Sequence, residues 1–141
     1  MPSEIAAKKL EQISTLLDEM EIFTALPFEE FEKNAGHLRG TERDFQLIVD
    51  LASDVNAELL LEAGHRAPDT YRQSFLSLAD AGIIGALLAK ELSESAMTRN
   101  ILVHEYDVDE DNEKFYRDAK RFLPLFREYL AGAVRYKKAG V

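Results

Sequence analysis

Apolar side chains recur at three- and four-residue intervals along most of this 141-residue chain. The longest regular series lies near the carboxyl end and forms a near-heptad seam of Phe115, Ala119, Phe122, Phe126, Tyr129, Leu130 and Ala133. This interval returns side chains to one face of an α-helix, whereas a half-buried strand needs strict alternation of apolar and polar residues. No such alternation occurs, so the sequence predicts an all-α fold. We expect an up-and-down bundle of four to five main helices.

Local signals divide the chain into helices. We expect them at 3–20, at 41–63, from a cap at Asp69 or Thr70 through Leu78, and at 83–97, with a final helix capped by Asp109. Gly82 should lie in the turn before the helix at 83–97, and Leu87 in the inward stripe of that helix. Pro27 should interrupt the chain after the first helix, and Gly64 should end the second in a left-handed conformation. The helix at 41–63 is apolar over almost half its circumference. Two explanations remain open for that width: one face meets a partner protein, or the helix is central to a single core.

Composition limits the class of protein. A chain of 141 residues that is 46% hydrophobic and 30% charged can form one globular domain, which we expect to span residues 1–141. The absence of cysteine excludes disulfides, thiolate zinc sites and a thiol nucleophile. No signal-peptide core or run long enough to span a membrane occurs, so a cytoplasmic location without membrane contact is expected.

Residues 99–106, with the sequence RNILVHEY, combine an apolar helical stretch with chemically active side chains. Arg99 offers a permanent cation that binds phosphate oxygens through a fork of N–H donors. His104 can accept or release a proton near neutral pH, and Tyr106 carries a hydroxyl that can be modified. A phosphate clamp beside a proton-transfer group is the minimum needed to cleave a phosphodiester without metal.

The spacing within this stretch restricts how the site can be assembled. At about 100° per residue, Arg99 and Tyr106 share one helix face, whereas His104 points roughly 140° away from Arg99. Either the helix ends or distorts near Val103, or a second copy of the chain completes the site. Both alternatives are compatible with the sequence.

The string from Arg99 to Tyr106 resembles the R-x4-H-x-Y signature of HepT-like proteins in the HEPN superfamily. Further similarity lies in Glu42-Arg43, in residues 68–72 (PDTYR) and in residues 82–84 (GII), so it covers roughly residues 40–125. The resemblance implies a helical, metal-independent endoribonuclease toxin with Arg99 and His104 in its active site. It also implies that the polar residue after the arginine, here Asn100, positions the phosphate or the histidine.

The same resemblance implies partners and a means of control. HepT-like toxins are paired with a MntA-like nucleotidyltransferase antitoxin, which transfers AMP onto the tyrosine of the motif, here Tyr106. The expected partners are therefore an RNA substrate, this antitoxin and a second copy of the chain in a homodimer. A formal charge of −9 opposes RNA binding, but a small cationic site needs only a few phosphate contacts.

Each of the three residues also has a purely structural explanation. Arg99 could pair with a carboxylate on a neighbouring helix, His104 could stabilise a helix carboxyl end, and Tyr106 could pack in the core. The three together, within the family pattern, favour the functional interpretation. No histidine or carboxylate spacing indicates a metal site, and we expect no metal or other cofactor. A non-catalytic helical module that binds a nucleotidyltransferase is the alternative function.

Overall fold

The computed structural model of the protein describes residues 4–104 and 111–139. These ranges contain seven helices and no strand, which confirms the predicted all-α class. The helices are α1 (Glu4–Thr24), α2 (Phe28–Lys33), α3 (Ala35–Glu62), α4 (Tyr71–Asp80), α5 (Ala86–Ser93), α6 (Ser95–His104) and α7 (Asn112–Ala139). None of these helices is both long enough and apolar enough to cross a lipid bilayer.

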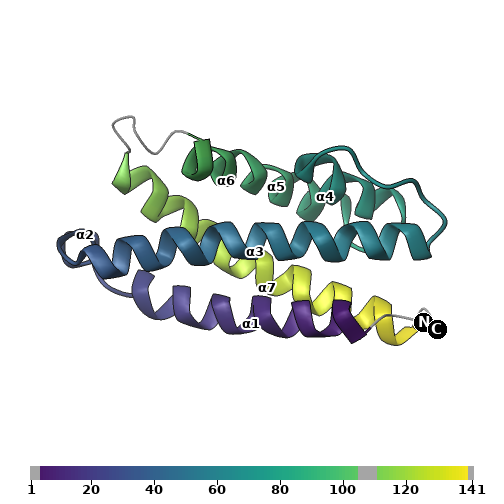
Figure 1. Ribbon diagram of the computed structural model, residues 1–141, viewed down its shortest axis with the longest axis horizontal. Helices are drawn as coiled ribbons and strands as arrows, with labels where there is room; N and C mark the ends of the chain where they lie inside the picture. The colour runs from purple at the N-terminus through teal and green to yellow at the C-terminus, as the bar shows by residue number, and fades with distance from the viewer. Residues whose placement is uncertain (1–3, 105–110, 140–141) are drawn as a thin grey trace.

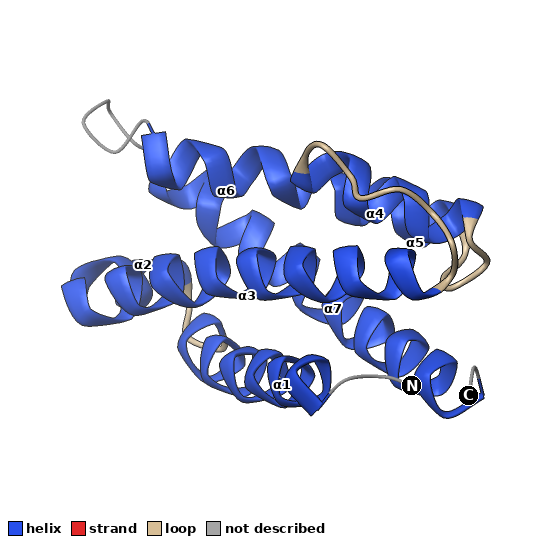
Figure 2. Ribbon diagram, turned by 45° about the vertical axis from the view of Figure 1, so that its right-hand side comes forward, coloured by secondary structure: helices blue, strands red, loops and turns tan. Residues whose placement is uncertain are grey.

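The longest helices, α3 and α7, organise the bundle. Helix α3 lies in the middle, with α1 along one side and the short helices α4, α5 and α6 along the other (Figure 1). Helix α7 crosses behind α3, and Figure 2 shows it between the two outer layers. This arrangement places α6, which carries Arg99, directly against α3.

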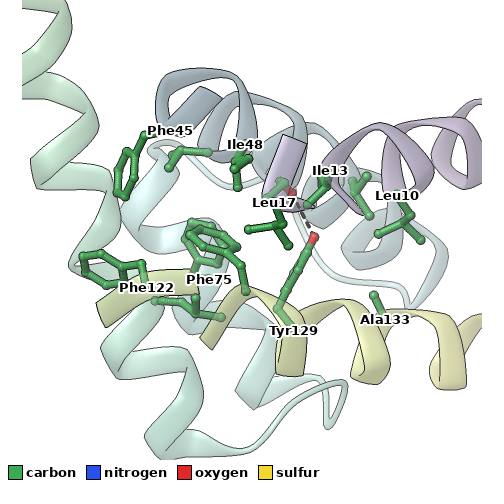
Figure 3. Close-up of a cluster of buried hydrophobic side chains, with 14 of the residues drawn as sticks. Leu10, Ile13, Leu17, Phe45, Ile48, Phe75, Phe122, Tyr129 and Ala133 are labelled. Carbon is green, nitrogen blue, oxygen red and sulfur yellow. Dashed lines mark hydrogen bonds between the residues drawn. The ribbon is translucent and has the colours of Figure 1, made fainter. Parts of the chain in front are cut away.

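One continuous hydrophobic core joins the layers. Large buried side chains from α1, α3, α4 and α7 meet at its centre, and Figure 3 shows several of them. The aromatic rings pack edge to face: Phe75 lies 6.1 Å from both Phe126 and Tyr129, and Phe45 lies 5.8 Å from Phe122. Such edge-to-face pairs stabilise a core beyond the burial of their surface alone. The seam predicted for the last helix is therefore a core seam.

The central position of α3 explains its wide apolar stripe. One side, including Ile48 and Val55, is fully buried, and the helix packs on α1, α2, α4 and α6. Of the two explanations that the sequence left open, a central helix in one core accounts for the stripe. The width of this stripe therefore gives no support to a homodimer.

Helix α3 begins at Ala35, about six residues before the expected start. The Asn34 side chain caps it by accepting hydrogen bonds from the backbone N–H groups of Gly36 and His37, at 2.9 and 3.3 Å. Gly40 lies within α3 at a point where a Cβ would come 2.9 Å from the Phe23 ring of α1. A close approach between helices, rather than a chain break, accounts for this glycine.

The helix expected at 83–97 is in fact two helices, α5 and α6, which meet at Glu94. The serines on either side turn back on the backbone: Ser93 Oγ donates to the carbonyl of Lys90 and Ser95 Oγ to that of Leu92, both at 2.6 Å. Side chains that compete for backbone carbonyls in this way weaken a continuous helix. Leu87 of α5, expected in the inward stripe, is 71% exposed.

The predicted turn and cap residues are mostly confirmed. Gly64 and Gly82 have φ angles of +84° and +75°, which favour glycine, and Thr70 Oγ1 caps α4 by accepting from Gln73 N at 3.0 Å. Asp111, rather than Asp109, caps α7, because its Oδ1 accepts from Lys114 N at 3.0 Å. Asp109 lies outside the described residues.

Candidate active site around Arg99

Arg99 is held at three points on the face of α6 that meets α3 and α4. Its Nε donates to Asp50 Oδ1 on α3 at 2.9 Å, and its Nη1 donates to Asn100 Oδ1 at 3.3 Å. The guanidinium carbon lies 4.9 Å from the centre of the Tyr71 ring, a distance at which a cation interacts with the face of the ring. The Arg99 side chain is only 17% exposed. The guanidinium is therefore fixed in orientation while part of it still reaches the surface.

Tyr71 reaches this position because a chain of buried hydrogen bonds anchors the start of α4. The Tyr129 hydroxyl donates to Asn56 Oδ1 at 2.7 Å, and Asn56 Nδ2 donates to Ser74 Oγ at 3.1 Å. Ser74 Oγ in turn donates to the backbone carbonyl of Tyr71 at 2.7 Å. Buried polar chains of this kind fix a unique packing when every member has a partner. The anchor connects the Tyr71 backbone to the core of α3 and α7.

The Tyr71 hydroxyl interacts electrostatically with the Arg99–Asp50 ion pair. Burial raises the pKa of Tyr71 above its usual value, and the charge of Asp50 and a hydrogen bond to Asp50 raise it further, while Arg99 acts in the opposite direction. The phenol therefore stays protonated at neutral pH. Asp50 thus pairs with Arg99 and also acts electrostatically on Tyr71.

A surface hollow of about 560 Å³ opens beside the Arg99 guanidinium. Its lining comes from the start of α4 and from α6: Thr70, Tyr71, Arg72, Ala96, Met97, Arg99 and Asn100. Two arginines, one amide and two hydroxyl-bearing residues thus border one concave surface of an acidic protein. Such a surface suits a phosphate group of a larger substrate.

The structure brings together only part of the predicted site. Arg99 and Asn100 lie side by side at the hollow, as adjacent residues of α6. Helix α6 continues through His104, whose side chain lies outside the described part of the structure, as does all of Tyr106. The roles assigned to Arg99, Asn100, His104 and Tyr106 therefore stay predictions, and so do both ways of joining Arg99 with His104.

Sequence reasoning did not identify Asp50 or Tyr71 as site residues. Asp50 precedes Arg99 by 49 residues, so no local spacing connects them. The available signal was indirect, since a carboxylate on a neighbouring helix was considered as the structural partner of Arg99 and Tyr71 lies in the family-like segment 68–72. The Arg99–Asp50 pair fits that structural explanation, and Arg99 also lines the hollow.

No group of three or more histidine or carboxylate side chains within residues 4–104 and 111–139 is arranged to hold a metal ion. Glu42 pairs with Arg39 at 3.5 Å, away from the hollow that Arg99 lines. Arg43 is exposed on α3. Neither of these family-like residues lines the hollow.

Comparison with known proteins decides the family. The sequence pattern of the family described as "HepT-like: Ribonuclease HepT-like" matches residues 13–132 of this chain. This chain belongs to the HepT-like ribonuclease family. The matched range runs from α1 to α7 and includes Arg99, Asn100, His104 and Tyr106.

A curated relative supports membership of the HepT-like family. It is described as "tRNA nuclease HepT" from Aphanizomenon flos-aquae (strain 2012/KM1/D3) and is 32% identical over 111 residues. The match covers 79% of this chain and 76% of the relative. The two proteins are thus similar over most of their lengths.

Solved structures show the same HepT-like fold. A tri-AMPylated HEPN toxin of Shewanella oneidensis, solved in complex with MNT antitoxin, superposes with a TM-score of 0.82 at 18% identity, covering 92% of this chain and 96% of that one. A toxin–antitoxin structure with AMP-PNP gives a TM-score of 0.81 at 17% identity, with coverages of 93% and 98%. At these identities the likeness establishes the fold.

Proposed function

We propose that this HepT-like protein is a metal-independent endoribonuclease toxin in which Arg99 binds the scissile phosphate and His104 transfers protons. The observation that carries the proposal is the half-buried Arg99 guanidinium, oriented by three neighbours at the edge of a hollow and located on the helix that ends at His104. Family membership and the tRNA nuclease among the relatives support it. We include tRNA among the test substrates for that reason.

The proposed reaction uses the RNA itself as nucleophile. The ribose 2′-oxygen attacks phosphorus as its proton leaves, and the bond from phosphorus to the 5′-oxygen breaks as that oxygen gains a proton. His104 takes the first proton or delivers the second, since imidazole can do either near neutral pH. Arg99 stabilises the negative charge that develops on the phosphorane-like transition state, and Asn100 orients the phosphate or the imidazole. The products carry a 2′,3′-cyclic phosphate and a 5′-hydroxyl.

A cleavage assay in EDTA tests this proposal. Arg99→Ala and His104→Ala should each slow cleavage by about 100-fold or more, whereas the parent should be unaffected by the chelator. Arg121→Ala is the matched control, because it removes an exposed arginine of α7 that pairs with Glu94 at 3.1 Å. Parent-like cleavage by His104→Ala, or a requirement for added metal, would show that the mechanism is wrong.

We propose further that a homodimer forms the RNA cleft. Two copies of Arg99 and His104 facing one groove would concentrate cations in a chain of net charge −9 and relieve the angular mismatch within one α6 helix. Sedimentation should give about twice the 16.0 kDa chain mass for the active species. A stable, fully active monomer would contradict this assembly.

Inactivation by a MntA-like nucleotidyltransferase antitoxin is the proposed form of control. The Tyr106 oxygen attacks the α-phosphorus of ATP, pyrophosphate leaves, and AMP stays on the tyrosine as a phosphodiester. The added anion competes for Arg99 while the adenosine blocks the cleft. The AMPylated Shewanella toxin supports this proposal by analogy. A Tyr106→Phe variant should resist inactivation on coexpression with the antitoxin, and a gain in mass by AMP units on that variant would exclude Tyr106.

A non-catalytic adaptor that binds a nucleotidyltransferase is the second candidate function. The acidic net charge favours it, and so does the fact that Asp50 already neutralises part of the Arg99 charge. Expression without an antitoxin distinguishes the two functions. Growth arrest that Arg99→Ala relieves supports the nuclease, whereas the absence of arrest together with tight binding of the nucleotidyltransferase supports the adaptor.

A further inference from the structure

The contacts of Arg99 with Asp50, Asn100 and the Tyr71 ring determine which of its N–H donors can reach a substrate. Asp50 engages Nε through one oxygen, at 2.9 Å, and Asn100 accepts from Nη1 at 3.3 Å. No contact to Nη2 occurs among the described residues. A guanidinium has five N–H donors in a fixed plane, so with one donor used at Nε and one at Nη1, the second Nη1 hydrogen and both Nη2 hydrogens can bind a phosphate.

We propose that Asp50 is a positioning residue for the nuclease reaction, acting with the Tyr71 ring to hold the Arg99 guanidinium so that its outer edge meets the substrate phosphate. The inference rests on the proposed function of Arg99 and extends it to α3 and α4. Its support is geometric: Asp50 Oδ1 accepts from Arg99 Nε at 2.9 Å, and the centre of the Tyr71 ring lies 4.9 Å from the guanidinium carbon.

The anchoring of both contacts in the core separates this arrangement from a chance surface ion pair. Asp50 projects from the central helix α3, and its side chain is 29% exposed. Tyr71 is held from behind by the buried chain through Ser74 and Asn56 to Tyr129. A functional group held by packed elements loses less entropy when it meets its substrate. The positions of Asp50 and Tyr71 therefore do not depend on a flexible surface side chain.

The same helix provides a matched control. Asp54 lies one turn after Asp50 and makes an ion pair of the same length, 2.9 Å, with Lys9 of α1. Its side chain is 57% exposed, its ion-pair partner is Lys9 rather than Arg99, and its charge makes the smallest contribution to the raised pKa of Tyr71. If charge loss on α3 alone mattered, Asp54→Asn and Asp50→Asn would behave alike.

The test measures kcat and KM for RNA cleavage in EDTA. Asp50→Asn should lower kcat by about tenfold or more, because the guanidinium loses its fixed orientation, while KM stays the same or falls because a carboxylate near the phosphate has gone. Asp50→Glu should recover part of the lost kcat, and Asp54→Asn should match the parent. An Asp50→Asn variant with parent kcat, or with a rise in KM alone, would overturn the proposal.

A second readout does not depend on activity. In the folded parent protein, the Nε–H resonance of Arg99 in a ¹⁵N spectrum should be resolved and protected from exchange, and Asp50→Asn should abolish that protection while Asp54→Asn preserves it. Protection that survives in Asp50→Asn would overturn the positioning role even if cleavage slows.

The outcomes also separate this inference from the proposed function. If Arg99→Ala abolishes cleavage and Asp50→Asn does not slow it, only the inference fails. If the parent and Arg99→Ala cleave RNA at the same rate, the nuclease role of Arg99 fails and the positioning role of Asp50 fails with it.

Discussion

Asp44 is a carboxyl group of α3 that is only 4% exposed, and its Oδ2 has no hydrogen-bond partner among the described residues. Burial raises its pKa to about 7, with further contributions from a hydrogen bond to Glu19 and from the Glu19 charge. The native protein therefore keeps a proton that the unfolded chain, with the ordinary value of 3.8, has already released. The free energy of unfolding should fall as pH rises from about 4 to about 7.

Substituting Asp44→Asn tests this linkage, because asparagine cannot ionise. The variant should be more stable than the parent by about 1–3 kcal/mol near pH 8, and the gap should shrink toward zero near pH 3, where Asp44 is mostly protonated in both the folded and the unfolded parent. Urea unfolding at the two pH values measures the gap. A difference that does not change with pH would show that the proton on Asp44 is not involved.

Substitution of Tyr129 tests the series of buried hydrogen bonds that anchors Tyr71. Its buried hydroxyl donates to Asn56 at 2.7 Å and lies 3.3 Å from the carbonyl oxygen of Ala52. Tyr129→Phe should destabilise the fold by about 1–3 kcal/mol, because it leaves a buried amide oxygen without its donor. Tyr136→Phe, at a half-buried position later in α7, is the control and should change the unfolding free energy by less than about 0.5 kcal/mol. Equal effects from the two variants would contradict the importance of the chain.

At the scale of single elements, two glycines that flank helices should differ in how much stability their substitution by alanine costs. Gly64 follows α3 with φ of +84°, whereas Gly85 precedes α5 with φ of −72° and open space around it. Gly64→Ala should cost about 1 kcal/mol, because side chains other than glycine rarely adopt that conformation. Gly85→Ala should cost less, about 0.5 kcal/mol, because the φ of Gly85 suits alanine and only the preference for glycine over alanine at an N-cap is lost. Thermal unfolding of both variants measures the contrast, and the reverse order would contradict the assigned conformations.

The sequence was informative about elements wherever local chemistry decides the outcome. Pro27, Gly64 and Thr70 mark boundaries that the structure confirms, because each acts through its own backbone or side chain. The start of α3 and the break at Glu94 escaped prediction for two reasons. Asn34 was not recognised as a cap. The apolar residues keep a helical spacing across Glu94, although the hydroxyls of the two neighbouring serines bind backbone carbonyls there.

The candidate site was predictable only in part, again for physical reasons. Arg99 and Asn100 could be identified from a short motif, and the structure places both at one hollow. Asp50 could not be identified, because its contact with Arg99 depends on how α3 packs against α6. Local patterns give the chemistry of a site, whereas tertiary packing supplies the residues that hold it.

At the scale of the whole molecule, net charge limits how the protein can bind RNA. With a charge of −9, binding must rely on a local cationic surface rather than a broad basic face. The logarithm of RNA affinity against the logarithm of salt concentration should therefore have a shallow slope, no steeper than about −3, and Arg99→Ala should reduce its magnitude by about 0.7 for each Arg99 that contacts a phosphate. Fluorescence anisotropy with a 2′-deoxy oligonucleotide of the same sequence measures the slope without cleavage. A slope near −6 or steeper would indicate an extensive phosphate interface that the local site does not provide.

The central claim is that the RNA 2′-hydroxyl is the nucleophile and that Arg99 and His104 supply the rest of the chemistry. Mass spectrometry of the products formed in EDTA tests it most directly. Every cut should leave a 2′,3′-cyclic phosphate on one fragment and a 5′-hydroxyl on the other, and His104→Ala should form these ends at least about 100-fold more slowly. Products with 5′-phosphate ends, or the same ends formed at the parent rate by His104→Ala, would contradict the claim.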